Sequence, residues 1–515
     1  MSQAVTKPNA IAVPQTGETP RIVRGLVYKT VSSGVTMALG IATSVILNRH
    51  FGAAGYGLLV MVFTVAGVCA GLADFGLNGV LGYYLPRLQR DGAVRVTRFL
   101  AAAVALLGVG VGGFGALLWF GRDTVALTFY KRPELSTLMT AGVVYFAGMV
   151  CAEFVIQILQ ALRWWAREAV ASIVFSLGYC LLVVVIVWRQ GSLSSVLLAN
   201  GAAAACAIGL GVVFLLSGGM VGLSRTSGEG GALQFRRDAA DILRFGLPIV
   251  LIGLNQLFLM WFDKMLLGLY GTPEDLAHYY VGFMFFNGLV VLMKVAYAVL
   301  MPYLSGIAEQ GAEKVRSDFQ LIFRGFLHGG LLVSIVSFFL AEPVILGLYG
   351  SEYRIAVESL RWLLAVFLLR TFVNPLGMFV QNVYGAPGKI WVSSLLLVGS
   401  DAILGLLLIP RFGYRGAVIT AVVSYAVYLL YFVVRFPQIR QMMPLGTIAK
   451  AAGALMVLGV VYGALSWVVP GLVVVQMGAC VATYAGWMLI TREVSSRDVA
   501  LGRRVWQQIV SSVAR

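Results

Sequence analysis

The sequence predicts an all-α integral membrane protein with about 14 transmembrane helices, arranged as two six-helix lobes and a C-terminal helix pair. Of its 515 residues, 59% are hydrophobic and only 12% are charged, and the mean hydropathy is +0.88. Soluble domains have about 25% charged residues. Windows of about 19 residues, the usual length for finding membrane spans, separate 14 apolar runs.

The apolar runs and the stretches between them divide the chain into six segments. A Gly-, Ser- and charge-rich stretch separates the first six runs from the next six, and its composition is typical of a flexible linker. The predicted segments are an N-terminal tail (1–25), a first lobe (26–216), the linker (217–241), a second lobe (242–435), a last pair of spans (436–490) and a C-terminal tail (491–515).

The two lobes show a weak internal repeat. Phe51-Gly52 with Tyr56-Gly57 resembles Tyr270-Gly271 with Tyr280 and Gly282. Because each copy has six spans, the copies share one orientation and are related by a pseudo-two-fold axis along the membrane normal. Such parallel repeats are typical of transporters that rock one half against the other.

The distribution of positive charge predicts the orientation. Roughly two thirds of the 38 lysines and arginines lie on the side of the two termini, and loops rich in these residues stay in the cytoplasm. Both termini are therefore expected in the cytoplasm. The net charge of +16 is a topology signal, and no nucleic-acid partner is expected. Apolar residues among arginines in the C-terminal tail predict an amphipathic helix on the membrane surface.

Several kinds of site are not expected. The five cysteines all lie in apolar runs without a Cys-x-x-Cys pair, and the three histidines have no metal-ligand spacing, so neither a metal nor a cofactor is predicted. The first 20 residues lack the apolar core of a signal peptide. The outward loops are too short for a catalytic domain, so catalytic residues are not expected.

One stretch, 242–270, differs from a simple membrane anchor. It is long enough to span a bilayer, yet it carries Pro248, Asn255, Gln256, Asp263 and Lys264. A charged group costs about 2.5–3.5 kcal/mol at the membrane centre and usually faces a water-filled cavity or a partner helix. Because proline also bends a helix, this stretch is interpreted as a helix that lines a cavity and moves.

Two pairs of motifs resemble a known family. Residues 48–57 read Asn-Arg-His-Phe-Gly-Ala-Ala-Gly-Tyr-Gly, and residues 72–77 read Leu-Ala-Asp-Phe-Gly-Leu. Later, Phe245-Gly246-Leu247-Pro248 precedes Phe262-Asp263-Lys264. These segments are similar to the patterns of the polysaccharide-biosynthesis flippases, the O-antigen and exopolysaccharide translocases of the superfamily that includes multidrug extruders. Asn48 and Phe51 depart from the Ala and Leu that are frequent in that pattern.

The resemblance implies a function and its partners. It implies alternating access and a polyprenyl-diphosphate-linked oligosaccharide that moves from the inner to the outer leaflet of the bacterial cytoplasmic membrane. Membrane lipids, H⁺ or Na⁺ and other polysaccharide-assembly proteins are the remaining expected partners. The protein is then a transporter and not an enzyme.

Positively charged side chains are the candidates for binding a diphosphate, because they offset its negative charge in a low-dielectric layer. Lys294 and Arg370 are the first candidates, with helix–helix ion pairing as the alternative. Lys264 has an adjacent acid, and Arg49 and Lys29 lie at the two ends of the first span. Amides that could bind sugar hydroxyls, or join helices, are Asn255, Gln256, Asn287, Asn374 and Gln381.

Four acids lie within or beside the predicted spans, namely Asp74, Glu153, Asp263 and Asp401. They either pair with the buried cations or hold a proton, since burial favours the neutral carboxyl. Asp263 and Asp74 are the preferred ion-coupling candidates.

Two other functions remain alternatives. One is a cation-coupled exporter of small drugs with the same fold, which the lysine and arginine in the spans oppose because they repel cationic drugs. The other is a membrane polymerase or glycosyltransferase, which the short outward loops oppose.

Overall fold

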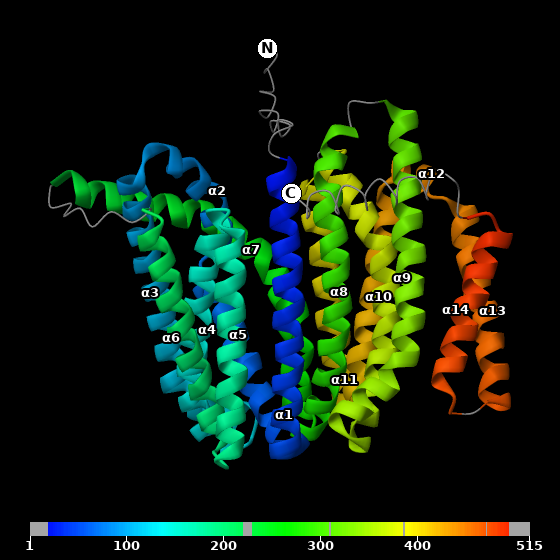
Figure 1. Cartoon of the computed structure of the whole chain (residues 1–515), viewed down its shortest axis with the longest axis horizontal. Coiled ribbons are helices and arrows are strands. Elements are labelled where there is room, and N and C mark those ends of the chain that lie inside the picture. Colours follow the sequence, from blue (N-terminus) through cyan, green and yellow to red (C-terminus); the bar gives the residue numbers. More distant parts are fainter. Residues whose placement is uncertain (1–18, 220–228, 308–310, 385–386, 470, 494–515) are drawn as a thin grey trace.

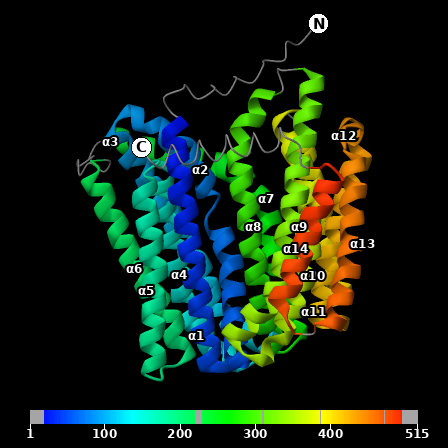
Figure 2. The ribbon, with the colours of Figure 1, turned by 45° about the vertical axis from the view of Figure 1, so that its right-hand side comes forward.

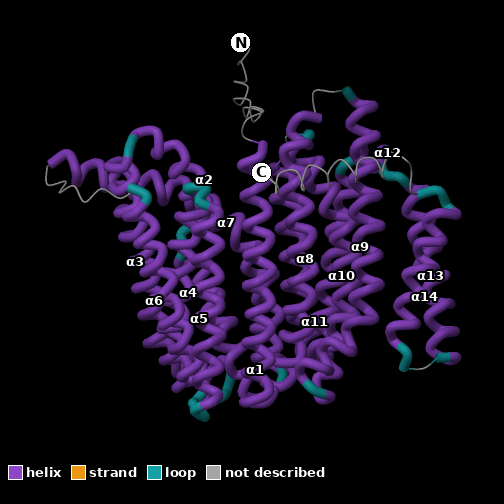
Figure 3. The backbone as a smooth tube through the Cα atoms, in the orientation of Figure 1, coloured by secondary structure: helices purple, strands orange, loops and turns teal. Residues whose placement is uncertain are grey.

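The structure is a computed structural model that describes residues 19–219, 229–307, 311–384, 387–469 and 471–493. The described residues form helices and turns without any strand (Figure 3), which confirms the all-α class. The predicted amphipathic helix of the C-terminal tail lies outside the described residues. The α-helices are α1 (Thr19–Ala73), α2 (Leu77–Leu88), α3 (Ala93–Asp123), α4 (Glu134–Ala161), α5 (Trp165–Trp188), α6 (Leu193–Ser217), α7 (Glu229–Tyr270), α8 (Pro273–Ile307), α9 (Ala312–Tyr349), α10 (Arg354–Asn382), α11 (Pro387–Arg435), α12 (Pro437–Met442), α13 (Leu445–Val468) and α14 (Val473–Ile490).

Two of these helices reverse direction at a glycine. Gly52 interrupts α1 with φ 69° and ψ 176°, and Gly413 interrupts α11 with φ 57° and ψ −133°. Positive φ is strained for residues with a Cβ, so glycine permits these tight reversals. Among the described residues, 11 helices are long and apolar enough to cross a membrane, or 12 with the bent α7. Because α1 and α11 each enter that number once, the count of 14 crossings stays a prediction.

The buried side chains form one shared core and two separate cores. At the end of the bundle where α1 reverses, here called the Gly52 end, one cluster combines residues of both lobes, such as Leu47, Leu138 and Val357. At the opposite end, called the Thr19 end, the two lobes have separate clusters, represented by Phe99 and by Phe323. The lobes are therefore joined at the Gly52 end and are packed independently at the Thr19 end (Figures 1 and 2).

Helix α7 belongs to both lobes. Its first part carries Ile242 into the core of the first lobe, and its second part carries Leu266 into the shared core. The two parts, Gln234–Leu251 and Gly253–Tyr270, meet at 47°, a few residues beyond Pro248, which lacks the amide for a helical hydrogen bond. The predicted bend is therefore present.

The flexible-linker prediction is wrong for residues 229–241, which form the first turns of α7. One charged side chain of this segment is fixed, since Arg95 of α3 donates two hydrogen bonds of 2.5 and 2.6 Å to Asp238. The Gly-, Ser- and charge-rich composition indicated a flexible linker, and composition cannot reveal that part of the segment packs on the first lobe. The remaining residues between α6 and α7, 220–228, lie outside the described part of the chain.

The motif segments around Gly76 and Gly246 touch each other. A Cβ at Gly76 would lie 2.4 Å from the carbonyl oxygen of Gly246, and a Cβ at Gly246 would lie 2.3 Å from the carbonyl oxygen of Phe75. The predicted span 57–84 is interrupted here, and α2 begins after Gly76 with φ 73°. The glycines in both motifs thus permit a backbone-to-backbone contact between the first lobe and α7.

Candidate functional site

Lys294 and Arg370 form a pair of positive charges where the shared core ends. Lys294 directly follows Met293 of the shared core on α8, and Arg370 of α10 lies one turn from Phe367 of the same core. The two cations are close enough to repel each other. No carboxylate forms an ion pair with either of them in the described part of the chain. The structure therefore brings the two first candidates together.

Most of the donors of this pair have no hydrogen-bond partner among the described residues. Arg370 donates from Nη1 to the Tyr425 hydroxyl of α11 at 2.9 Å, and its Nε is buried without a hydrogen bond among the described residues. The Lys294 side chain is exposed. An anion with several oxygens fits such a group of donors, because charge-assisted hydrogen bonds are stronger than neutral ones. Tyr425 is missing from the predicted residues, since nothing in the sequence links it to Arg370.

The predicted amides lie at different places. Asn374 follows Arg370 by one turn and donates to the Met293 sulfur at 3.4 Å. Asn287 precedes Lys294 by seven residues on α8, so the two share one helix face. Gln381 lies further toward the Thr19 end and accepts a hydrogen bond of 3.4 Å from Tyr297. On α7, Asn255 is buried and its neighbour Gln256 is exposed.

Lys264 and Asp263 belong to a second charged group, here called the enclosed group, in which the lysine is completely buried and Asp263 is partly buried. The Lys264 ammonium is 0% exposed and lies 2.9 Å from Asp263 Oδ1, 2.7 Å from the Met260 carbonyl oxygen and 3.3 Å from the centre of the Phe283 ring. The Tyr279 hydroxyl donates to the other carboxylate oxygen of Asp263 at 2.5 Å. All the contacts of the Lys264 ammonium among the described residues lie inside the protein.

Asp401 of α11 is the third charged member of this enclosed group. It interacts electrostatically with both Asp263 and Lys264, and it is 8% exposed. No hydrogen bond to its carboxylate is present among the described residues. The group therefore holds two carboxylates and one ammonium. Asp263 is paired with the ammonium, and Asp401 is the carboxylate without a hydrogen-bonded cation among the described residues.

The other two acids lie near each other in the first lobe. Asp74 sits in the break between α1 and α2, where it accepts the backbone N–H of Asn78 at 3.3 Å. Glu153 of α4 is exposed, interacts electrostatically with Asp74 and accepts from Gln157 at 3.4 Å.

Lys29 and Arg49, the two cations at the ends of the first span, both have protein partners. Lys29 lies 2.5 Å from Glu168 of α5, whose side chain is 0% exposed. Arg49 donates to the carbonyl oxygens of Leu348 and Gly347 at 2.8 and 3.0 Å, at the end of α9. Lys29 thus holds α1 within the first lobe, and Arg49 ties α1 to the second lobe.

Two further hydrogen bonds connect the lobes at the Gly52 end. The Ser44 hydroxyl bonds to Tyr349 of α9, and the Asn48 side chain accepts from the Tyr353 hydroxyl. Together with Arg49, these contacts close the Gly52 end. At the Thr19 end, the described residues form two separate cores and no cluster that joins the lobes.

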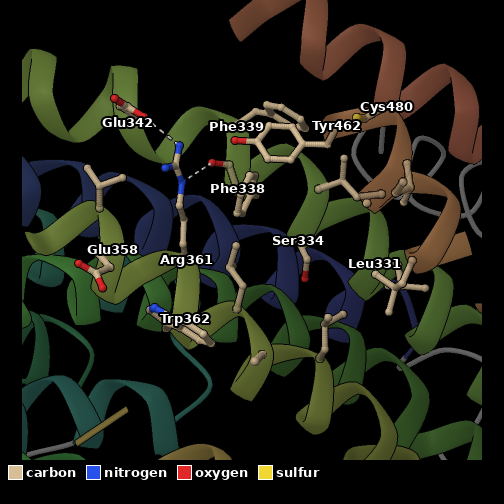
Figure 4. A pocket seen from close by; sticks show the side chains of 18 of the residues that line it. Leu331, Ser334, Phe338, Phe339, Glu342, Glu358, Arg361, Trp362, Tyr462 and Cys480 are labelled. Atoms are coloured by element: carbon tan, nitrogen blue, oxygen red, sulfur yellow. Dashed lines mark hydrogen bonds and ion pairs between the residues drawn. The ribbon is translucent and has the colours of Figure 1, made fainter. Parts of the chain in front are cut away.

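A groove of about 730 Å³ lies between α9, α10 and the α13–α14 pair. Figure 4 shows its mostly apolar walls and, along one side, Arg361, which donates to Glu342 at 3.0 Å and to the Phe338 carbonyl at 3.3 Å. All its lining residues belong to the second lobe and the C-terminal pair. The groove can hold hydrocarbon, but it does not lie between the lobes.

Two sequence comparisons relate the chain to known proteins. The family described as "Polysaccharide biosynthesis protein" matches residues 22–308, more than half of the chain. A curated relative from Ralstonia solanacearum, "EPS I polysaccharide export inner membrane protein EpsE", is 23% identical over 320 residues, which are 61% of this chain and 70% of the relative.

Solved structures show the same fold. A lipid II flippase, MurJ, in an inward closed conformation has a TM-score of 0.72 at 12% identity and covers 90% of this chain and 98% of its own. A multidrug resistance MATE transporter in an outward-facing conformation has a TM-score of 0.56 at 15% identity, covering 84% and 98% of the two chains. The predicted transporter fold is confirmed, and the chain belongs to the polysaccharide biosynthesis protein family.

Proposed function

We propose that this protein is a flippase that moves a polyprenyl-diphosphate-linked oligosaccharide from the inner to the outer leaflet of the bacterial cytoplasmic membrane. The movement serves surface polysaccharide biosynthesis and proceeds by alternating access. The family, the name of the Ralstonia relative and the fold shared with a lipid II flippase support this proposal. The excess of positive charge beside the termini supports an orientation with the Thr19 end in the cytoplasm.

The observation that carries the proposal is the pair Lys294 and Arg370. A diphosphate that enters the bundle leaves water, and its negative charge needs compensation there. The two cations meet this need because no protein carboxylate in the described residues uses them. Their place at the end of the shared core lets a head group reach them from the Thr19 end, where the lobes are packed separately.

The test is transport in vesicles that contain the purified protein. A labelled polyprenyl-diphosphate oligosaccharide is placed in one leaflet, and its appearance in the other leaflet is followed with an impermeant reagent. We expect Lys294→Ala and Arg370→Ala each to slow translocation about 10- to 100-fold, the equivalent of a charge-assisted hydrogen bond. Arg122→Ala is the matched control, because Arg122 pairs with Asp123 on α3 at 3.7 Å.

Two results contradict the proposal. Transport by both variants at the normal rate means that these cations do not bind the substrate. Expulsion of small cationic dyes by a protein that leaves the lipid in place supports the drug-exporter alternative instead.

For ion coupling, Asp401 is the better candidate within the enclosed group, because both oxygens of Asp263 already have partners. We expect a proton or sodium gradient to accelerate transport by the normal protein and to have no effect on Asp401→Asn. If the gradient accelerates both proteins equally, Asp401 is not the coupling residue, and Asp74 becomes the next residue to test.

A further inference from the structure

A cavity of about 240 Å³ lies where the first lobe meets α8, away from the cation pair. Its walls come from both halves of α1, from α4 and α5, and from α8 of the second lobe. None of the described residues that line it carries a charge. Among the lining residues are Gly40, Phe63 and four tyrosines, Tyr56, Tyr145, Tyr179 and Tyr280.

Four tyrosines from four different helical segments converge on this cavity. Tyr56, Tyr145 and Tyr179 each lie close enough to interact electrostatically with Tyr280 of α8. The Tyr179 hydroxyl is buried and has no hydrogen-bond partner among the described residues. Buried polar atoms normally have a partner, so this hydroxyl indicates a ligand or water molecule that completes the site.

The lining chemistry selects a neutral ligand rich in hydroxyl groups. Phenol and alcohol hydroxyls both donate and accept hydrogen bonds, as sugar hydroxyls do. Binding sites commonly combine apolar and aromatic walls with a few convergent polar groups, and here Phe63 stacks on Tyr145 at 4.9 Å. A phosphate or carboxylate finds no compensating positive charge in this cavity.

One face of α8 connects the cavity with the cation pair. Tyr280, Asn287 and Lys294 follow each other at intervals of seven residues, which places them on nearly the same face of the helix. At 1.5 Å per residue, Tyr280 and Lys294 are about 21 Å apart along the helix axis. Asn287 lies midway and offers an amide to a molecule that extends along this face.

We propose that the tyrosine cavity binds a sugar ring of the lipid-linked oligosaccharide, at a distance of several sugar units from the diphosphate. The inference rests on the proposed function, with the diphosphate held by Lys294 and Arg370. The tyrosine hydroxyls form hydrogen bonds with the hydroxyl groups of the sugar, whereas the cation pair recognises only the charge of the diphosphate. Because Tyr280 comes from the second lobe and the other three tyrosines from the first, the bound sugar contacts both lobes at once.

The test compares two radiolabelled lipids in equilibrium binding to the purified protein. One probe is a polyprenyl diphosphate that carries a neutral trisaccharide, and the other is the same polyprenyl diphosphate without sugar. We expect Tyr145→Phe, Tyr179→Phe and Tyr280→Phe each to weaken binding of the trisaccharide lipid about 3- to 10-fold, as for one lost hydrogen bond. Binding of the sugar-free lipid stays the same.

A second variant blocks the cavity without removing a hydroxyl. Gly40 lines the cavity, and a Cβ there would meet no atom within 4 Å, so the first side-chain atom of Gly40→Leu fits without a clash and the rest of the side chain takes up cavity space. We expect the affinity for the trisaccharide lipid to fall to that for the sugar-free lipid. Gly112→Leu on α3 is the control, because a Cβ there also meets no atom within 4 Å and Gly112 lies outside the cavity.

The possible outcomes separate the two proposals. If the normal protein binds neither lipid, the proposed function itself fails. If it binds both lipids but without preference for the sugar, or if all tyrosine and glycine variants bind like the normal protein, the cavity holds only water and the sugar inference is overturned. Loss of binding to both lipids in a tyrosine variant, with unchanged melting behaviour, also contradicts a role confined to the sugar.

Discussion

Lys264 of α7 and Lys294 of α8 differ in how many partners the protein provides for their ammonium groups. Lys264 is fully enclosed, and its ammonium contacts a carboxylate, a carbonyl oxygen and an aromatic ring. Lys294 is exposed, and the charged group that acts on it among the described residues is another cation, Arg370. The comparison teaches that sequence position alone does not identify a substrate-binding cation. An ammonium whose partners are all internal holds the fold together, and one without such partners remains available.

The largest expected effect comes from removing the enclosed lysine. Lys264→Met leaves the Asp263 carboxylate buried without its cation, and breaking one side of a buried pair costs about 3–5 kcal/mol. We expect the free energy of unfolding to fall by about this amount in a reversible detergent titration. Lys294→Met is the matched control, and an equal loss of stability in both variants would remove the distinction between the two lysines.

The second expected effect has the opposite pattern. Lys294→Met leaves stability unchanged or raises it, because the substitution relieves the repulsion between Lys294 and Arg370. We expect binding of sugar-free polyprenyl diphosphate to weaken about 10-fold or more, since a charged hydrogen-bond partner is lost. Lys264→Met is the control for binding, because the folded fraction of that variant retains Lys294 and Arg370 and is expected to bind the lipid with normal affinity.

A smaller effect is expected for Arg49, a cation of the first lobe whose hydrogen-bond partners belong to the second lobe. Arg49→Ala removes two hydrogen bonds to α9 at an exposed site, which contribute about 1 kcal/mol to the closed Gly52 end. The population that is open at this end should rise about 5-fold. Spin labels at His50 and Glu352 in a cysteine-free background report it as a longer distance. An unchanged distance distribution means that the shared core alone keeps this end closed.

The smallest effect is expected outside the membrane spans, where water weakens ion pairing. Glu493, just after α14, accepts from Lys450 at 2.8 Å and from Thr447 at 3.1 Å. Burial raises the pKa of Glu493, but these hydrogen bonds and the nearby charges outweigh burial and hold the pKa below its ordinary value of 4.5.

A lowered pKa in the folded state has a definite consequence for pH dependence. The stabilisation by Glu493 is complete above the ordinary pKa and is lost as the pH falls through the lowered one. We expect acidification below pH 4.5 to lower the melting temperature slightly more in the normal protein than in Glu493→Gln. Equal acid sensitivity of both proteins means that this ion pair does not stabilise α13 and α14.

The fold class and the transporter fold could be predicted because hydropathy and short motifs report on them directly. The reversals at Gly52 and Gly413 coincide with breaks between predicted spans, although the structure needs only a glycine where the sequence suggested a longer connection. The helical residues 229–241 could not be predicted, because their order depends on packing against the first lobe.

The site was only partly predictable. Lys294 and Arg370 stand out in the sequence since charged residues are rare in apolar runs. By contrast, the partners of Arg49 are backbone carbonyls, which no sequence pattern marks. The tyrosine cavity was missed because Tyr56, Tyr145, Tyr179 and Tyr280 are far apart in the chain and each is an ordinary residue in a membrane helix. Only the packing of four helical segments reveals that they converge.

Because the lobes are joined by the shared core at the Gly52 end, a rotation of one lobe against the other is centred at that end and moves the Thr19 end most. Helix α8 has 35 residues and is about 52 Å long at 1.5 Å per residue. A rotation of about 10° around the pivot therefore moves the far end by about 9 Å, close to the diameter of a helix. Small changes in the packing of Leu47, Leu138 and Val357 thus produce a large displacement at the Thr19 end. Substitutions that add or remove a methyl group in the shared core are therefore expected to change the separation of the lobes at that end.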